Sequence, residues 1–455
     1  MAGIKSQKQY EKMTETPVAK LVVSLGIPTT IIMMITMLYN MVDTAFVGTL
    51  GTSASGATGI VFGYMAVLQA TGFLFGHGAG AIVSRLLGEK RPDDASRIAS
   101  TGFAAAFLMG LLVSILTLLF MNPLLRLLGS TETILPYARS YCRFIALGAP
   151  FIMGAFVLNN LLRYEGLATK AMIGMVTGGI LNIGLDALLI FGLHMGTGGA
   201  GLATALSQMC SFFILLYMFL SGQAQCRLSV RNISRRAHDL LEIISVGFPS
   251  LVRQALGSLS TIVLNNLAGH YGDAAIAGMA ICGRVVMFLF AFCLGMGQGY
   301  QPVCSFNYGA KKYQRVRDAY KTIIAITTVL LAALAAAAFA FAPQIVRVFR
   351  NDPEVIAIGG QALRYACLVM IVLPFNTATN MTLQSSGKSL HASITSAMRN
   401  GLFFLPVLLI LSNLIGLRGI QMAQPISDVL TFLATIPFGV HYFRTLPKES
   451  TLQEA

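Results

Sequence analysis

Residues 26–51 read GIPTTIIMMITMLYNMVDTAFVGTLG, and this stretch decides the fold. It lies within an apolar run at residues 18–48 that is long enough to cross a bilayer, since a transmembrane helix needs about 20 residues. A stretch of the same length and pattern, GFPSLVRQALGSLSTIVLNNLAGHYG, returns at residues 247–272. The sequence therefore predicts a membrane protein built from two related halves.

The composition supports this prediction. Of the 455 residues, 55% are apolar and 11% are charged, and the mean hydropathy is +0.71. Soluble proteins carry about 25% charged residues, so this chain has too few charges to cover a surface that faces water.

Apolar runs separated by polar, glycine or proline-containing loops predict twelve transmembrane helices. They are expected at residues 18–48, 56–84, 98–121, 134–162, 171–192, 199–220, 238–270, 274–304, 319–341, 354–383, 393–415 and 419–443. A membrane β-barrel is excluded because its strands would be alternating segments of about ten residues. The predicted fold class is an all-α integral membrane protein with two pseudo-symmetric six-helix bundles and a central cavity.

The chain is expected to divide into five parts. They are a cytoplasmic N-terminal segment (1–17), a first half (18–222), a basic cytoplasmic linker (223–237), a second half (238–443) and a cytoplasmic tail (444–455). Each half holds six spans, so both enter the membrane from the same side, as in transporters with parallel repeats.

Repeated glycines mark the two halves. At a shift of 221 residues, Gly26 aligns with Gly247 and Gly78 aligns with Gly299. Shared glycines at matching depth indicate shared close contacts between helices. Candidate helix kinks, where proline removes a backbone donor, are at Pro28, Pro249 and Pro374.

The distribution of lysine and arginine predicts that both termini lie in the cytoplasm, because cytoplasmic loops carry an excess of these residues. The residues assigned to the cytoplasmic side are Lys5, Lys8, Lys12, Lys20, Arg85, Lys90, Arg91, Arg97, Arg163, Lys170, Arg227, Arg231, Arg235, Arg236, Lys311, Lys312, Arg315, Arg317, Lys321, Lys388, Arg399, Arg444 and Lys448. This bias accounts for most of the formal net charge of +14, and no nucleic-acid partner is predicted.

Two carboxylates lie inside the first and fifth predicted spans, Asp43 and Asp186. An ionisable group at membrane depth is costly and is a functional candidate by default. Asp43 aligns with Leu264 of the second half, and Asp186 aligns with Pro406 or Val407. The fold therefore does not require acids at these positions, which indicates a task specific to the first half.

Amide side chains share a helix face with both acids. Asn182 and Asp186 are four residues apart, and Asn40 and Asp43 are three apart. Carboxylates with neighbouring amide and hydroxyl oxygens can bind Na⁺, whereas two carboxylates close together can instead share a proton. The alternative is a structural role in which hydrogen bonds or a buried arginine satisfy each acid.

Other polar residues within the spans are weaker candidates. Arg253 could line an aqueous cavity or bind helix-end carbonyls, and a hydrogen bond between packed helices is favoured for the histidine of the second span. Flexible methionines suit a surface that accepts many ligands, or they simply pack. The candidate substrate-cavity residues are Met37, Tyr39, Asn40, His77 and Arg284.

No phosphate-binding glycine loop with a lysine is present, so ATP is excluded as the energy source. No catalytic constellation is found either, and the chain is predicted to be no enzyme and to carry no cofactor. Uphill transport would draw on an ion gradient.

These residues resemble a known family. Residues 26–51 are similar to the first helix of multidrug and toxic compound extrusion (MATE) transporters, with its early proline and its Asp before VGxLG. Residues 247–272 resemble the seventh helix. GAGAIVSRLLGEKR (78–91) and GQGYQPVCSFNYGAKK (297–312) resemble the segments after spans two and eight. The likeness covers nearly the whole chain and is strongest to the bacterial MepA/DinF-like branch.

The resemblance implies a cation site in the first half, formed by Asp43, Asn182, Asp186 and Thr204. A glutamate that some subfamilies carry on span seven is not evident, which argues against a second cation site. The resemblance also implies antiport by alternating access, in which H⁺ or Na⁺ enters as small organic, often cationic, compounds leave. A single chain in the cytoplasmic membrane of a bacterium is expected.

Two alternatives stay open at the level of sequence. One is a flippase for a lipid-linked precursor from the same superfamily, which Arg253 and Arg284 keep under consideration. The other is a membrane-embedded enzyme or receptor, which the two-fold repeat argues against. Carboxylates and amides serve either ion, so the sequence does not distinguish H⁺ from Na⁺.

Overall fold

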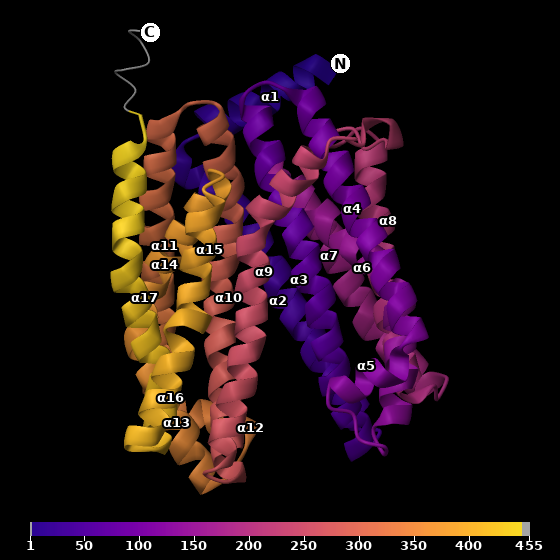
Figure 1. The fold of residues 1–455 in the computed structure, drawn as a ribbon, viewed down its shortest axis with the longest axis vertical. Coiled ribbons are helices and arrows are strands. Elements are labelled where there is room, and N and C mark those ends of the chain that lie inside the picture. The colour runs from indigo at the N-terminus through magenta and orange to yellow at the C-terminus, as the bar shows by residue number, and fades with distance from the viewer. Residues whose placement is uncertain (1, 448–455) are drawn as a thin grey trace. The chain divides into compact units, whose positions relative to one another are not determined.

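The computed structural model describes residues 2–447, and all regular structure among them is helical (Figure 1). Within those residues, twelve helices are long and apolar enough to cross a membrane, as predicted. The spans of the first half are α2 (Val18–Gly48), α3 (Thr52–Gly88), α4 (Pro92–Leu119), α6 (Leu135–Tyr164), α7 with η1 (Ala168–Gly192) and α8 (Gly196–Leu220). The spans of the second half are α9 (Ala237–Gly269), α10 (Asp273–Gly309), α11 (Tyr313–Ala340), α13 to α14 (Pro353–Ser385), α15 to α16 (Ser389–Ile415) and α17 (Leu417–Thr445).

Three short helices were not predicted. They are α1 (Ala2–Glu15) within the N-terminal segment, α5 (Met121–Leu127) and α12 (Ala342–Phe349). The short α5 and α12 each follow the third span of their half, so the repeat includes these connecting helices. They contain too few apolar residues to be recognised as spans. Most of the predicted tail, residues 448–455, lies outside the described residues.

Three spans depart from regular α-helix. In the fifth span, α7 (Ala168–Asp186) continues as the π-helix η1 (Ala187–Gly192). The eleventh contains the π-helix η4 (Met398–Leu402), and the tenth contains the 3₁₀ turn η3 (Met370–Val372). The tenth span is interrupted at the predicted position, because α14 restarts at Leu373 directly before Pro374, whereas α2 and α9 continue as α-helix through Pro28 and Pro249. Short π-helical turns occur frequently at functional sites.

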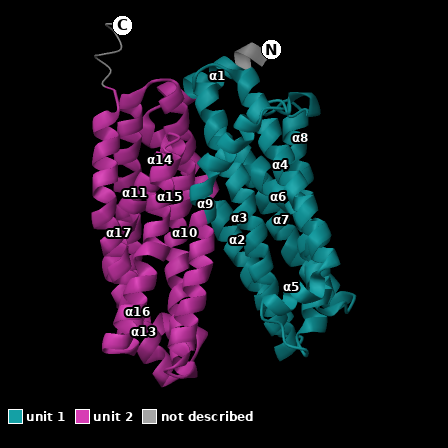
Figure 2. Cartoon of the chain, in the orientation of Figure 1, with its two compact units in different colours: residues 1–12, 31–251 teal, residues 13–30, 252–455 magenta. Residues whose placement is uncertain are grey.

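The chain folds into two compact units, and each takes in a short segment from the other half (Figure 2). The first unit comprises residues 1–12 and 31–251, and the second comprises residues 13–30 and 252–455. The beginning of α2 therefore packs with the second half, and the beginning of α9 packs with the first half. The repeat in the sequence and the division by packing differ in these two leading segments.

The repeated glycines make the contacts of those segments. In the first unit, a Cβ atom added to Gly78 would lie 2.0 Å from the carbonyl oxygen of Ile243 on α9. In the second unit, a Cβ atom added to Gly299 would lie 2.3 Å from the Cα atom of Gly26 on α2. The close helix contacts predicted from the shared glycines are thus confirmed.

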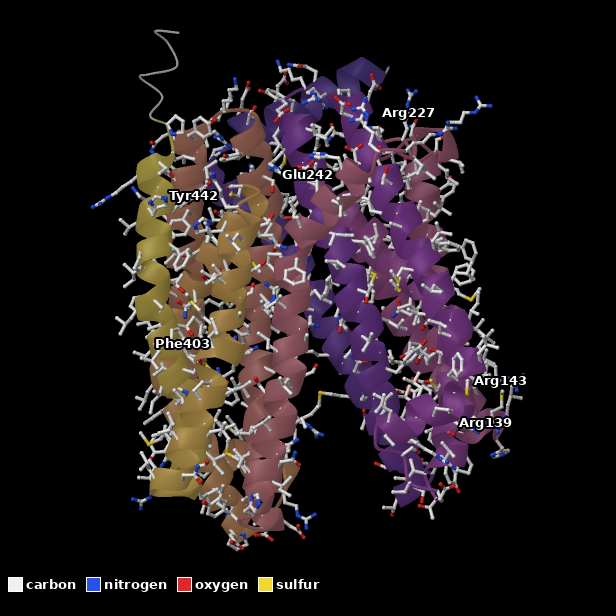
Figure 3. All side chains as sticks on the ribbon, in the orientation of Figure 1. Arg139, Arg143, Arg227, Glu242, Phe403 and Tyr442 are labelled. Atoms are coloured by element: carbon white, nitrogen blue, oxygen red, sulfur yellow. The ribbon has the colours of Figure 1, made fainter. Side chains whose placement is uncertain are left out.

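The linker after α8 is fixed to the first unit by a buried carboxylate. Glu165, between α6 and α7, accepts hydrogen bonds from the backbone amides of Gln225 (2.6 Å) and Cys226 (3.2 Å). Burial raises the pKa of Glu165 from 4.5 to about 7, although the amide hydrogen bonds oppose the shift. Within the first unit, Arg227 of the linker lies near one end, and Arg143 and Arg139 lie in the half toward the other end (Figure 3).

One assignment to the cytoplasmic side is wrong. Arg399 lies in η4, well inside the span Ser389–Ile415, and it forms an ion pair with Asp428 of α17. The sequence analysis counted Arg399 with the loop before this span and did not consider Asp428. The charge is accommodated at this depth because the guanidinium has a buried counter-ion.

Candidate cation site

The four predicted cation ligands come from three helices of the first unit. Asp43 is on α2, Asn182 and Asp186 are on α7, and Thr204 is on α8. The exposed fractions are 2% for Asp43, 1% for Asn182, 0% for Asp186 and 2% for Thr204. Since a buried carboxylate is costly without a partner, the partners of each oxygen decide what the site can do.

Two hydrogen bonds order the site. The hydroxyl of Tyr141 on α6 donates to Asp43 Oδ2 at 2.6 Å, and Asn182 Nδ2 donates to Thr204 Oγ1 at 3.4 Å. The second bond directs the amide oxygen of Asn182 away from the threonine. Asp43 and Asp186 are also close enough to interact electrostatically.

At this site, four acceptor oxygens are buried and have no hydrogen-bond partner among the described residues. They are Asp43 Oδ1, Asn182 Oδ1 and both carboxylate oxygens of Asp186. An unsatisfied buried acceptor costs about 1–3 kcal/mol, and more when the group is charged. A proton or a cation such as Na⁺, which takes oxygen ligands, would satisfy them.

Close helix packing holds these residues in place. A Cβ atom on Gly179 of α7 would lie 3.3 Å from Tyr39 Cδ1 of α2, and one on Gly201 of α8 would lie 2.4 Å from the Tyr141 carbonyl oxygen. At Gly201 the neighbour is a backbone atom, so a larger residue would force α6 and α8 apart. The π-helix η1 begins directly after Asp186, so the backbone changes its winding at this carboxylate.

The candidate substrate-cavity residues have different surroundings. Tyr39 is buried and its hydroxyl accepts a hydrogen bond from Gln208 Nε2 at 3.3 Å. Met37 and Asn40 are partly exposed. Arg284, in the second unit, is exposed and lines a depression of about 420 Å³. Assignment of these residues to a substrate cavity stays a prediction.

His77 is completely buried within the first unit. Its Nδ1 atom lies 2.7 Å from Ser250 Oγ on α9, and its ring stacks on Phe73 with centroids 4.9 Å apart. This contact is the hydrogen bond between packed helices that the sequence favoured. In the second unit, Arg253 Nη1 donates to Asn380 Oδ1 at 3.3 Å.

Sequence reasoning missed Tyr141 and Gln208, which bond to Asp43 and Tyr39. The repeat contains a signal for the first of them, because Tyr141 aligns with Ala362 at the shift of 221. Comparing every polar residue within a span to its counterpart, rather than only the charged ones, would have identified it.

Comparisons with known proteins identify the family of this chain. The MatE family model matches residues 28–188 and 249–410, one segment in each half. The multidrug export protein MepA of Staphylococcus saprophyticus is 28% identical over 430 residues, which cover 94% of this chain and 95% of the relative. MepA of Staphylococcus haemolyticus is 28% identical over 442 residues, covering 96% and 97%.

Solved structures show the same fold. A MATE crystal structure in complex with MaL6 has a TM-score of 0.91 and 27% identity, covering 96% of this chain and 99% of that one. An outward-facing multidrug resistance MATE transporter of the MOP superfamily has a TM-score of 0.90 and 26% identity, covering 95% and 98%. With the family model matched in both halves, the chain belongs to the MATE family of multidrug efflux transporters.

Proposed function

We propose that this chain is a secondary active antiporter that exports small organic, often cationic, compounds in exchange for H⁺ or Na⁺. The observation that supports it most directly is the group of four buried, unpartnered acceptor oxygens on Asp43, Asn182 and Asp186. Two of these side chains are carboxylates, so their shared charge attracts a small cation. Relatives named as multidrug export proteins support the substrate class.

The coupling step follows from electrostatics. With the site empty, the Asp43 and Asp186 carboxylates repel each other in a medium of low dielectric constant. A proton or Na⁺ removes this repulsion and lets α2 pack more closely against α7. Because Tyr39 and Asn40 lie on the same stretch of α2 as Asp43, cation binding changes the helix that carries candidate substrate contacts, and bound compound is released.

Alternating access then couples the two flows. A ligand shifts a conformational equilibrium only by its differential affinity for the two states. In this proposal, the cation stabilises one packing of α2 and the organic compound stabilises the other, so each displaces the other. We place the protein in the cytoplasmic membrane of a bacterium, with both termini in the cytoplasm and one chain as the working unit.

Counterflow in proteoliposomes tests the proposal. Efflux of a fluorescent organic cation is measured under imposed Na⁺ and pH gradients, applied separately, for the wild type and for Asp43→Asn and Asp186→Asn. Both variants should lose gradient-driven transport, whereas Asp93→Asn, which changes an exposed acid at the start of α4, should transport normally.

The separate gradients also identify the ion. Transport driven by only one of them assigns H⁺ or Na⁺. If Asp43→Asn and Asp186→Asn both retain undiminished gradient-driven transport, the proposed coupling is wrong, even if the protein moves organic compounds.

A further inference from the structure

The second unit contains one ion pair within its spans, among the described residues. Arg399 Nε in η4 donates to Asp428 Oδ1 on α17 at 2.8 Å. The side chain of Asp428 is 5% exposed and that of Arg399 is 21% exposed. A buried ion pair contributes little net stability on average, because desolvation offsets the attraction between the charges. Stability alone therefore does not explain this pair.

Further contacts fix both partners. Gln424 Nε2 donates to Asp428 Oδ1 at 3.0 Å, and Ser427 Oγ donates to the backbone carbonyl of Arg399 at 2.8 Å. The guanidinium carbon lies 4.3 Å from the ring centroid of Phe290 on α10. The carboxylate thus accepts from a guanidinium and an amide at the same oxygen.

The repeat identifies what occupies this place in the first half. Arg399 aligns with Gly178 at a shift of 221, and Asp428 aligns with Gln208 at the shift of 220 that also relates Ser427 to its counterpart. Gln208 bonds to Tyr39 at 3.3 Å. The first half therefore uses a neutral hydrogen bond where the second half uses a positive and a negative charge.

The second half has no acid at the positions of the candidate cation site. The residues that align with Asp43, Asn182, Asp186 and Thr204 are Leu264, Phe403, Val407 and Gln424. Phe403, labelled in Figure 3, follows η4 directly. Gln424 is the residue that bonds Asp428 one helical turn away, so the acid of the second half lies next to the equivalent of the cation site.

We propose that the guanidinium of Arg399 takes the place of a mobile cation at Asp428. Without Arg399, this carboxylate of the second half would bind a proton or Na⁺. A mobile ion enters and leaves the first-half site, whereas the guanidinium stays bound in the second half. The pair thereby limits the chain to one coupling site. Neutralising Arg399 should open Asp428 to a proton or Na⁺. This inference rests on the proposed cation coupling in the first half.

The test measures carboxyl groups directly. Infrared difference spectra are recorded on purified full-length protein in lipid nanodiscs, with NaCl exchanged for choline chloride and with pH varied. The background variant is Asp43→Asn/Asp186→Asn, so that the two acids of the candidate cation site give no signal. Adding Arg399→Gln should produce a new carboxyl response to Na⁺ or pH, and further addition of Asp428→Asn should remove it.

Two variants act as controls for the charge itself. Arg399→Lys keeps a cation beside Asp428 and should show no new response. Gln424→Lys, added to Arg399→Gln, supplies a cation from the residue that already reaches Asp428, and it should silence the response again. A folded Arg399→Gln protein with no response that depends on Asp428 would overturn the inference, because the pair would then be purely structural.

Failure to fold is also informative. If Arg399→Gln unfolds in choline chloride at neutral pH, the inference requires that NaCl or acid restores folding, measured by size exclusion and thermal unfolding. Loss of folding under every condition, while Arg399→Gln/Asp428→Asn folds, overturns it. The proposed function fails independently, since it depends on the difference between the wild type and Asp43→Asn/Asp186→Asn.

Discussion

Replacing Gly78 by alanine tests the helix contact that joins α9 to the first unit. The added Cβ atom would lie 2.0 Å from the Ile243 carbonyl oxygen, 3.0 Å from its carbonyl carbon and 3.1 Å from the Gly247 amide nitrogen. All three are backbone atoms, so no flexible side chain can move aside. To restore an ordinary contact of 3.4 Å, the two helices must separate by about 1.4 Å.

The expected cost follows from overpacking. Inserting one methyl group into a well-packed interior costs about 1–3 kcal/mol, and occasionally more. Alanine recovers up to about 1 kcal/mol because it is a better helix former than glycine. The contact here is shorter than most, so we expect the Gly78→Ala change to lower the free energy of unfolding by about 2 kcal/mol.

Gly59 provides the matched control on the same helix. A Cβ atom at Gly59 meets no atom within 4 Å, so Gly59→Ala should be neutral or slightly stabilising. The free energy of unfolding is measured by steric trapping in bicelles for both variants. Equal stability of Gly78→Ala and Gly59→Ala would refute the contact between α3 and α9.

Two further predictions concern buried polar groups. Tyr141→Phe removes the only hydrogen bond of the Asp43 carboxylate among the described residues. A hydrogen bond to a charged group is worth about 1.5–3 kcal/mol, and its loss destabilises the empty, charged site, so the half-saturating Na⁺ or H⁺ concentration should fall about tenfold or more. Tyr64→Phe should leave this concentration unchanged. Glu165 has a pKa of about 7 in the folded protein, compared with an ordinary value of 4.5. The folded state therefore binds the proton more tightly than the unfolded state does. As pH rises from 4.5 through 7, the free energy of unfolding should fall by about 3 kcal/mol. Chemical unfolding across that range should show this slope, and Glu165→Gln should flatten it; an unchanged slope would exclude Glu165 as its source.

The sequence was sufficient for the spans because membrane thickness constrains them so strongly. Each of the twelve predicted runs corresponds to a helical span, and α2 begins at Val18 and ends at Gly48 as expected. The three short helices were missed since seven to fourteen residues carry no spanning signal. The π-helices were missed because winding depends on packing around a residue, and no local residue pattern specifies it.

Part of the candidate site could be predicted from the sequence. The asymmetry between the halves pointed to Asp43 and Asp186, since an acid without a counterpart serves no shared structural role. The same reasoning did not reach Asp428, which the sequence analysis did not consider, and Arg399 was assigned to the cytoplasmic loop before its span. Which charges neutralise one another depends on tertiary contacts that no spacing reveals.

The exchange of leading segments affects how the protein is made. Residues 13–30 leave the ribosome long before α10, yet they pack in the second unit, where Gly26 meets Gly299 of α10. At roughly 5–20 residues per second, translation of the intervening chain takes tens of seconds. During that interval residues 31–48 of α2 can pack in the first unit, whereas residues 18–30 of the same helix lack their final neighbours. A nascent chain released before α10 is complete would therefore leave the leading half of its first transmembrane helix without a docking partner.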